Sequence, residues 1–70
     1  MDTTTKITMQ LLEDLADGDG VLNGEYAHYY ESLEEGQPKE VVSVALKRIL
    51  SESKGATCEF GETGFTLKFN

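Results

Sequence analysis

The segment from Pro38 to Lys54 constrains the fold most, because its apolar residues repeat at helical spacing. At about 100° per residue they share one broad arc, formed by Val41, Val42, Ala45, Leu46, Ile49 and Leu50. The opposite arc is polar except for Val44. Pro38 suits the first turn of a helix, and Gly55 suits the position just after its end. The pattern predicts a helix over residues 38–54 that buries one side and leaves the other in solvent.

The C-terminal segment alternates apolar and polar residues on both sides of a glycine-rich turn. The apolar positions are Ala56, Cys58 and Phe60 before the turn, and Phe65, Leu67 and Phe69 after it. This pattern predicts a β-hairpin over residues 56–69. A tight turn between Gly61 and Gly64 pairs Phe60 with Phe65 and Cys58 with Leu67, which places every apolar side chain on one face. An isolated hairpin is only marginally stable, so this face must pack against helices.

The N-terminal segment has a weaker helical pattern. Ile7, Leu11 and Leu15 recur at helical spacing, which predicts a helix over about residues 5–16 after a frayed end at residues 1–4. Thr5 or Thr8 is the expected N-cap. A short strand over residues 6–9 is the alternative interpretation.

Two Asp-Gly steps, Asp17-Gly18 and Asp19-Gly20, then break the helix, because both residue types favour turns. Val21 and Leu22 suit at most a very short strand. Beyond them, Asn23 is a good N-cap, and the aromatic spacing predicts a second helix over about residues 24–34, with one face formed by Tyr26, Tyr30 and Leu33. Gly36 and Pro38 indicate a tight turn between this helix and the next one.

The expected fold class is therefore α+β, with three helices and a C-terminal hairpin in one small domain. The order of these elements resembles the winged helix-turn-helix family over about residues 7–69. The best local match is GQPKEVVSVALKRIL, in which Gly36 lies in the turn, Val42 and Leu46 point inward, and Lys47-Arg48 is a basic pair. A different packing of three helices and a hairpin is the alternative.

The resemblance implies binding to DNA, with the third helix in the major groove and the hairpin as the wing. The residues implied for DNA contact are Lys39, Ser43, Val44, Lys47, Arg48, Ser51 and Lys54. Lys68 would reach the DNA backbone from the wing, whose tip carries Glu62 and Thr63. The purely structural interpretation is that these residues form only the solvated side of a core helix.

The charge distribution favours a second hypothesis. Residues 1–37 contain nine acids and one base, for a net charge of −8, whereas residues 38–70 contain four acids and five bases, for +1. The net charge of −7 argues against strong DNA binding by one monomer, because neutralisation of phosphates by basic side chains supplies much of the affinity. In a homodimer with its acidic sides turned outward, the repulsion between these acids and the DNA phosphates would be smaller. An acidic module that binds a basic protein surface, as an inhibitor or nucleic-acid mimic, is the alternative. Its expected patch comprises Tyr26, Tyr29, Tyr30, Glu31, Glu34 and Glu35. The purely structural interpretation of this patch is that its tyrosines belong to the core.

No set of residues indicates an enzyme, a cofactor or a metal site. Asp17, Asp19 and Gly20 resemble part of a calcium loop, but Leu15 and Tyr26 would occupy the first and last ligand positions, so a turn is expected instead. His28 has no second His or Cys near it. The single Cys58 alternates with apolar neighbours and is expected to be a small core residue. Because the chain has one cysteine, no secretory signal and no long apolar run, a cytoplasmic protein without a membrane-spanning segment is expected.

Overall fold

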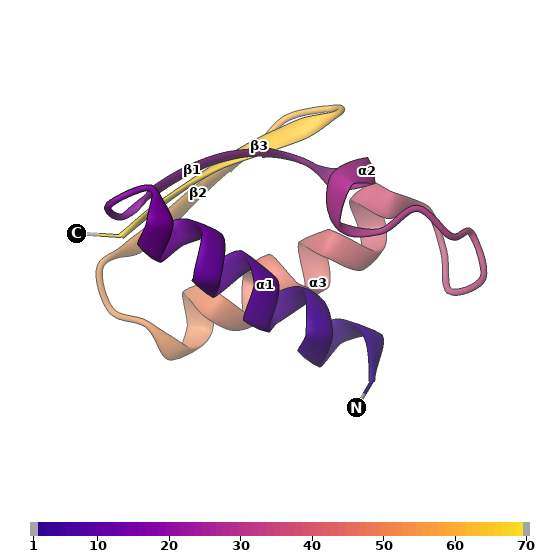
Figure 1. Ribbon diagram of the computed structural model, residues 1–70, viewed down its shortest axis with the longest axis horizontal. Helices are drawn as coiled ribbons and strands as arrows, with labels where there is room; N and C mark the ends of the chain where they lie inside the picture. The colour runs from indigo at the N-terminus through magenta and orange to yellow at the C-terminus, as the bar shows by residue number, and fades with distance from the viewer. Residues whose placement is uncertain (1, 70) are drawn as a thin grey trace.

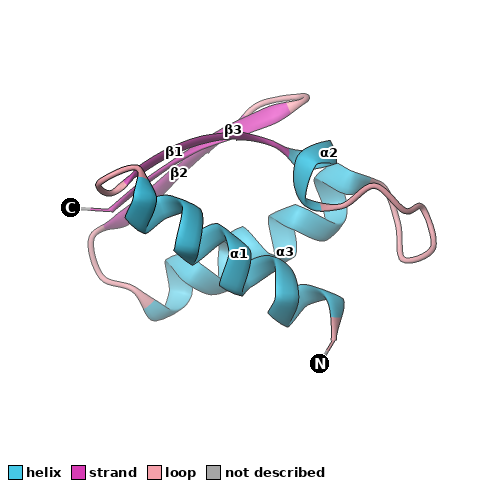
Figure 2. Ribbon diagram, in the orientation of Figure 1, coloured by secondary structure: helices cyan, strands magenta, loops and turns pink. Residues whose placement is uncertain are grey.

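The computed structural model describes residues 2–69, which form a three-stranded antiparallel sheet with helices against one of its faces (Figures 1 and 2). The elements in order are α1 (Thr3–Asp17), β1 (Val21–Glu25), α2 (Tyr26–Tyr29), α3 (Pro38–Glu52), β2 (Ala56–Phe60) and β3 (Gly64–Phe69). This confirms the predicted α+β class with three helices and a C-terminal hairpin, in a winged-helix-like order. Within the described range, no helix is long and apolar enough to cross a bilayer. Met1 and Asn70, at the ends of the predicted domain, lie outside the described residues.

The last strand, β3, occupies the centre of the sheet, which has the order β1-β3-β2. The predicted hairpin register is confirmed: Phe60 pairs with Phe65, and Cys58 pairs with Leu67. The Gly61 N–H donates to the Gly64 carbonyl at 2.8 Å and closes the turn. On its other side β3 pairs with β1, where Leu22 faces Leu67. Segments more than 40 residues apart in sequence are thus hydrogen-bonded neighbours.

The core lies between the sheet and the two long helices. The inward arc predicted for α3 is confirmed, because Val41, Val42, Ala45, Leu46 and Ile49 are buried and Leu50 is half-buried. These side chains belong to one cluster with Ile7, Leu11 and Leu15 of α1 and with Phe65 and Leu67 of β3. Full burial of a large aliphatic side chain stabilises a fold by about 1.5–3 kcal/mol. The cluster therefore holds α1, α3 and the hairpin together without a disulfide.

The predicted helix over residues 24–34 is wrong. Residues up to Glu25 belong to β1, only Tyr26–Tyr29 are helical, and residues 30–37 form an eight-residue connection in place of the expected tight turn. The strand extends this far because Gly24 and Glu25 pair with Phe65 and Gly64 of β3. The Phe65 ring lies close to Gly24, where a Cβ would be 2.7 Å from Cζ of the ring. The proposed helix face also fails, because Leu33 is 65% exposed whereas Tyr26 and Tyr30 are buried.

The ends of the two long helices also differ from expectation. Helix α1 begins at Thr3, not Thr5, because the Asp2 side chain accepts a hydrogen bond from the Thr5 N–H at 2.7 Å and serves as the N-cap. Neither Thr5 nor Thr8 is the cap, residues 2–4 are not frayed, and the alternative strand over residues 6–9 is excluded. Helix α3 ends at Glu52, two residues before the predicted end, and Gly55 follows with a φ of 86°.

Candidate binding surfaces

The side of α3 that faces away from the core holds most of the residues implied for DNA contact. Five of them are exposed on α3: Lys39, Val44, Lys47, Arg48 and Ser51. Lys54 is exposed too, but it lies two residues beyond the end of the helix. Ser43 is half-buried. At about 100° per residue, Val44, Lys47 and Ser51 lie near the middle of this side, opposite the buried arc. Lys47 is thus the basic residue placed most directly toward solvent.

Arg48 lies at the edge of that side and turns toward α1. Its Nη1 donates to Oγ1 of Thr5 at 3.4 Å. Nearby, the hydrogen bond from the Thr5 N–H lowers the pKa of the Asp2 carboxyl, and the positive charge of Arg48 contributes in the same direction. Arg48 therefore already has partners at the start of α1.

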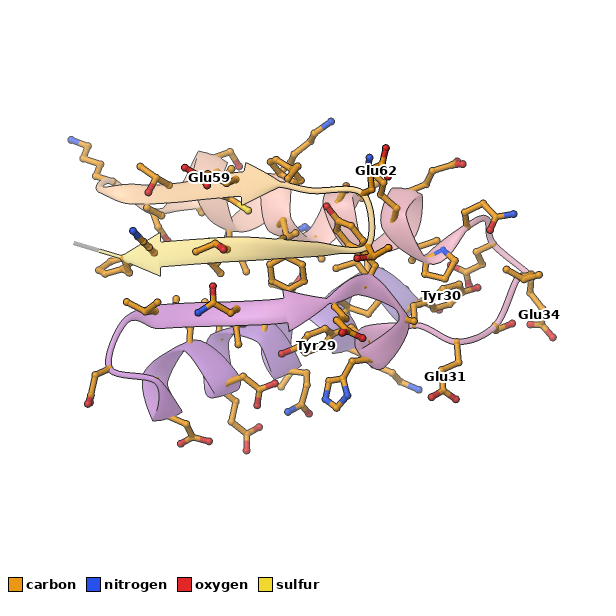
Figure 3. All side chains as sticks on the ribbon, turned by 90° about the horizontal axis from the view of Figure 1, so that it is seen from above. Tyr29, Tyr30, Glu31, Glu34, Glu59 and Glu62 are labelled. Atoms are coloured by element: carbon orange, nitrogen blue, oxygen red, sulfur yellow. The ribbon has the colours of Figure 1, made fainter. Side chains whose placement is uncertain are left out.

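The tip of the hairpin lies beside the start of α3. A pocket of about 250 Å³ separates them and is lined by Tyr26, Ala27, Gln37, Pro38, Lys39, Glu62 and Thr63. Glu62 and Lys39 thus bring opposite charges to one surface, and the Glu62 label in Figure 3 marks the turn end of the hairpin. Lys68 is not part of this surface. It pairs with Val21 and Thr57 near the other end of the sheet.

The tyrosines of the expected acidic patch are largely internal. Tyr26 is 2% exposed and donates from its hydroxyl to the Gly61 carbonyl at 2.9 Å. Tyr30 is 9% exposed, and its hydroxyl accepts a hydrogen bond from the Glu35 N–H at 2.9 Å. Two of the three tyrosines thus stabilise the fold and offer little surface to a partner.

The glutamates of that patch do lie at the surface. Glu31, Glu34 and Glu35 are exposed on the 30–37 connection, which projects from one end of the molecule (Figures 1 and 3). Both the backbone and the side chain of Glu35 are hydrogen-bonded. Its N–H donates to the Tyr30 hydroxyl, and its carboxylate accepts a hydrogen bond from Oγ1 of Thr3 at 2.8 Å. The connection is therefore an anchored acidic loop next to the start of α3.

A second group of polar side chains, which the sequence did not predict to lie together, is found beside β1. The Tyr29 hydroxyl donates to Oδ2 of Asp14 at 2.5 Å, and the His28 ring packs edge-on against Tyr29 with centroids 5.0 Å apart. Burial raises the pKa of Tyr29 well above its usual value, and the hydrogen bond and charge of Asp14 raise it further. These residues line a pocket of about 380 Å³ together with Leu22, Asn23, Gly24 and Glu25. Asp14 and Tyr29 belong to different helices, so no sequence spacing could have joined them.

The Asp-Gly segment is a turn, as expected. The N–H groups of Gly18 and Gly20 donate to the carbonyls of Asp14 and Leu15, which ends α1, and Gly20 has a φ of 90°. Within residues 2–69, no three His, Cys, Asp or Glu side chains come together as a metal site requires.

Cys58 is half-buried and packs against the core, as predicted. Burial raises the pKa of its thiol, and the neighbouring negative charge of Glu59 raises it further. The thiol therefore stays protonated at neutral pH, and only a thiolate is a good nucleophile.

Comparisons with protein-family models, with curated protein sequences and with solved structures found no match to this chain.

Proposed function

We propose that this protein binds DNA through the outward side of α3. The observation that supports the proposal best is the distribution of positive charge. Four of the six basic residues of the chain belong to the segment 38–54, and all four are exposed. The buried arc of α3 holds this side outward, and the winged-helix-like arrangement places the hairpin tip next to its N-terminal end. A helix presented in this way can enter the major groove, with Lys and Arg meeting phosphates.

The roles of the individual residues follow from their positions. Lys47 and Lys54 would neutralise phosphates, Ser51 would donate to a phosphate or a base edge, and the methyl groups of Val44 would contact a thymine methyl. Arg48 would have to leave Thr5 before it could reach DNA. Because the net charge of the chain is −7, binding should be weak, and its fall with added salt should follow the few phosphates that Lys39, Lys47, Arg48 and Lys54 neutralise.

The test is a titration of isotope-labelled protein with mixed-sequence duplex DNA at low and moderate salt. The proposal predicts shifts of the Lys47 and Arg48 amides at low salt, and Lys47→Gln should weaken binding more than Lys6→Gln. Lys6 is the matched control, because it is also exposed but lies on α1. The proposal fails if no α3 amide shifts at low salt, or if the two variants lose equal affinity.

The anchored acidic loop supports one further candidate, a module that binds a basic protein surface. Glu31, Glu34 and Glu35 project from a connection held by Tyr30 and Thr3, so these charges would reach a partner with little loss of conformational entropy. A titration with a soluble basic protein tests this candidate. Shifts confined to residues 31–35 would support it, and unchanged affinity of a variant with all three glutamates replaced by glutamine would exclude it.

A further inference from the structure

The first strand, β1, is an edge of the sheet, and one side of its backbone is open. The Phe69 N–H donates to the Gly20 carbonyl and the Tyr26 N–H donates to the Thr63 carbonyl, so even-numbered residues of this segment direct their backbone groups toward β3. In an antiparallel ladder this direction alternates along the strand. The N–H and C=O of Asn23 and the N–H of Glu25 therefore point away from β3, where no strand formed by residues 2–69 covers them. An open edge of this kind can accept a further strand.

The pocket of about 380 Å³ lies along this open edge, which also makes it a candidate for strand addition. One wall is β1 from Leu22 to Glu25, and the other is formed by Asp14 of α1 with His28 and Tyr29 of α2. Figure 3 shows α1 running beneath β1 and beyond its edge, with Tyr29 below the strand. An extended segment beside β1 would therefore lie over the part of α1 that extends beyond the strand. Its alternate side chains, opposite Leu22 and Gly24, would point into the pocket, because side chains of a strand alternate between faces.

The negative charge of this region favours a basic ligand. Asp14 and Glu25 line the pocket, and Glu13 and Asp17 lie on the same side of α1 at helical spacing. Asp14 is held in place, because its Oδ1 accepts from Nε2 of Gln10 at 3.0 Å and its Oδ2 accepts from Tyr29. A carboxylate has about four acceptor positions, so Asp14 can still accept a hydrogen bond from an ammonium or guanidinium group.

We propose that the open edge of β1 binds an extended basic peptide segment by strand addition. The backbone of the segment bonds to Asn23 and Glu25, and a Lys or Arg side chain enters the pocket to meet Asp14. This site is independent of the outward side of α3 and of the acidic loop. A second copy of the chain is a poor occupant, since pairing β1 with its own copy would bring Asp14 and Glu25 of both molecules together.

The experiment titrates isotope-labelled protein with a short peptide of alternating lysine and threonine at low salt. The proposal predicts amide shifts at Asn23 and Glu25, slower hydrogen exchange of the Asn23 N–H, and no comparable shifts with a peptide of alternating glutamate and threonine. Shifts centred on residues 31–35 or on α3, equal binding of the glutamate peptide, or peptide-independent dimerisation with the same Asn23 shifts would each overturn it.

Two variants separate the backbone contribution from the charge contribution. Asn23→Pro removes an N–H on the open side, together with the hydrogen bond that Oδ1 of Asn23 accepts from Oγ1 of Thr66. It leaves the β3-facing backbone groups of Leu22 and Gly24 intact, because proline is tolerated on the free side of an edge strand. It should abolish binding while the remaining amide spectrum stays folded. If this variant unfolds, Asp14→Asn and Glu25→Gln test the proposal instead, because each keeps the shape of its side chain and removes its charge. Each should weaken peptide binding about two- to five-fold. Unchanged affinity of both charge variants would refute the assignment.

Discussion

The hydroxyl of Tyr26 donates a hydrogen bond to the carbonyl oxygen of Gly61, 35 residues later, and so ties the single turn of α2 to the hairpin turn. We expect Tyr26→Phe to keep the packing of the ring and to lose about 1 kcal/mol of unfolding free energy, the usual net value of one such bond. Urea unfolding measures this loss. Thr63→Ala is the control, since it changes the same turn and keeps two backbone hydrogen bonds, from the Gly61 N–H to the Gly64 carbonyl and from the Tyr26 N–H to the Thr63 carbonyl. A Tyr26→Phe variant as stable as the parent would show that the bond is dispensable.

A side chain at Gly24 is expected to destabilise the fold. The Cβ of Gly24→Ala would lie 2.7 Å from Cζ of Phe65 and 3.1 Å from Cε2 of Tyr29, so both rings must move. Overpacking of this kind costs about 1–3 kcal/mol. Thermal unfolding should reveal the loss, whereas Val21→Ala on the same strand should cost less, because Val21 is 43% exposed and the change introduces no close contact. Equal stabilities of the two variants would contradict the close contact.

The two sides of α3 should respond differently to the loss of an apolar side chain. Leu46 is fully buried, and Leu46→Ala should lower the unfolding free energy by about 2–5 kcal/mol. Val44 is 54% exposed, so Val44→Ala should cost little stability and should instead weaken DNA binding. Denaturant unfolding and a DNA titration of both variants check the two expectations. A large stability loss at Val44 would place that side chain in the core.

Tyr29 should be slow to ionise in alkaline solution. Its pKa in the folded protein is raised by burial and by Asp14, whereas an unfolded tyrosine has a pKa of about 10. Because the unfolded state loses this proton first, the stabilising contribution is fully present below about pH 10 and is lost as the pH rises further. Phenolate absorbance of the parent and of Tyr29→Phe assigns the titration. Asp14→Asn should lower the pKa of Tyr29, and an unchanged titration in that variant would remove Asp14 as a cause.

The charge at the hairpin tip should tune affinity for DNA. Glu62 lies with Lys39 on one surface, and Glu62→Lys exchanges a charge that repels phosphate for one that attracts it. We expect tighter binding and a steeper dependence on salt, by about one unit in the logarithmic slope for an added phosphate contact. Glu59→Lys on the outer face of β2 is the control, with the same change in net charge. Equal gains for both variants would indicate a general charge effect and no role for the tip.

Local patterns predicted the elements that are held together by local contacts. The alternation around Gly61 and Gly64 gave the hairpin register, and the arc from Val41 to Leu50 gave α3, because neighbours in sequence decide both. The segment around Gly24 failed for the opposite reason. Its conformation depends on β3 and on the ring of Phe65, about 40 residues away, and this tertiary contact overrides an aromatic spacing that suits a helix.

The candidate surfaces followed the same rule. The exposed side of α3 could be read from the helix alone, whereas the pocket beside β1 combines Asp14, Asn23 and Tyr29 from three elements. From the sequence, the tyrosines at positions 26 and 30 are candidates both for an interaction surface and for the core, with the core favoured for each single residue. The structure decides for the core: Tyr26 reaches the hairpin turn through its hydroxyl, Tyr30 bonds to the Glu35 N–H, and both side chains are buried.

The central position of β3 has a consequence for synthesis on the ribosome. Helix α1, β1 and α3 all emerge before β3, yet β1 and β2 contact each other only through that strand. Until β3 emerges, the apolar sides of both long helices lack the part of their cover that the sheet supplies, and such nascent chains are open to aggregation or to chaperone binding. The nascent chain should therefore gain protease resistance in one late step, when residues 64–69 leave the exit tunnel.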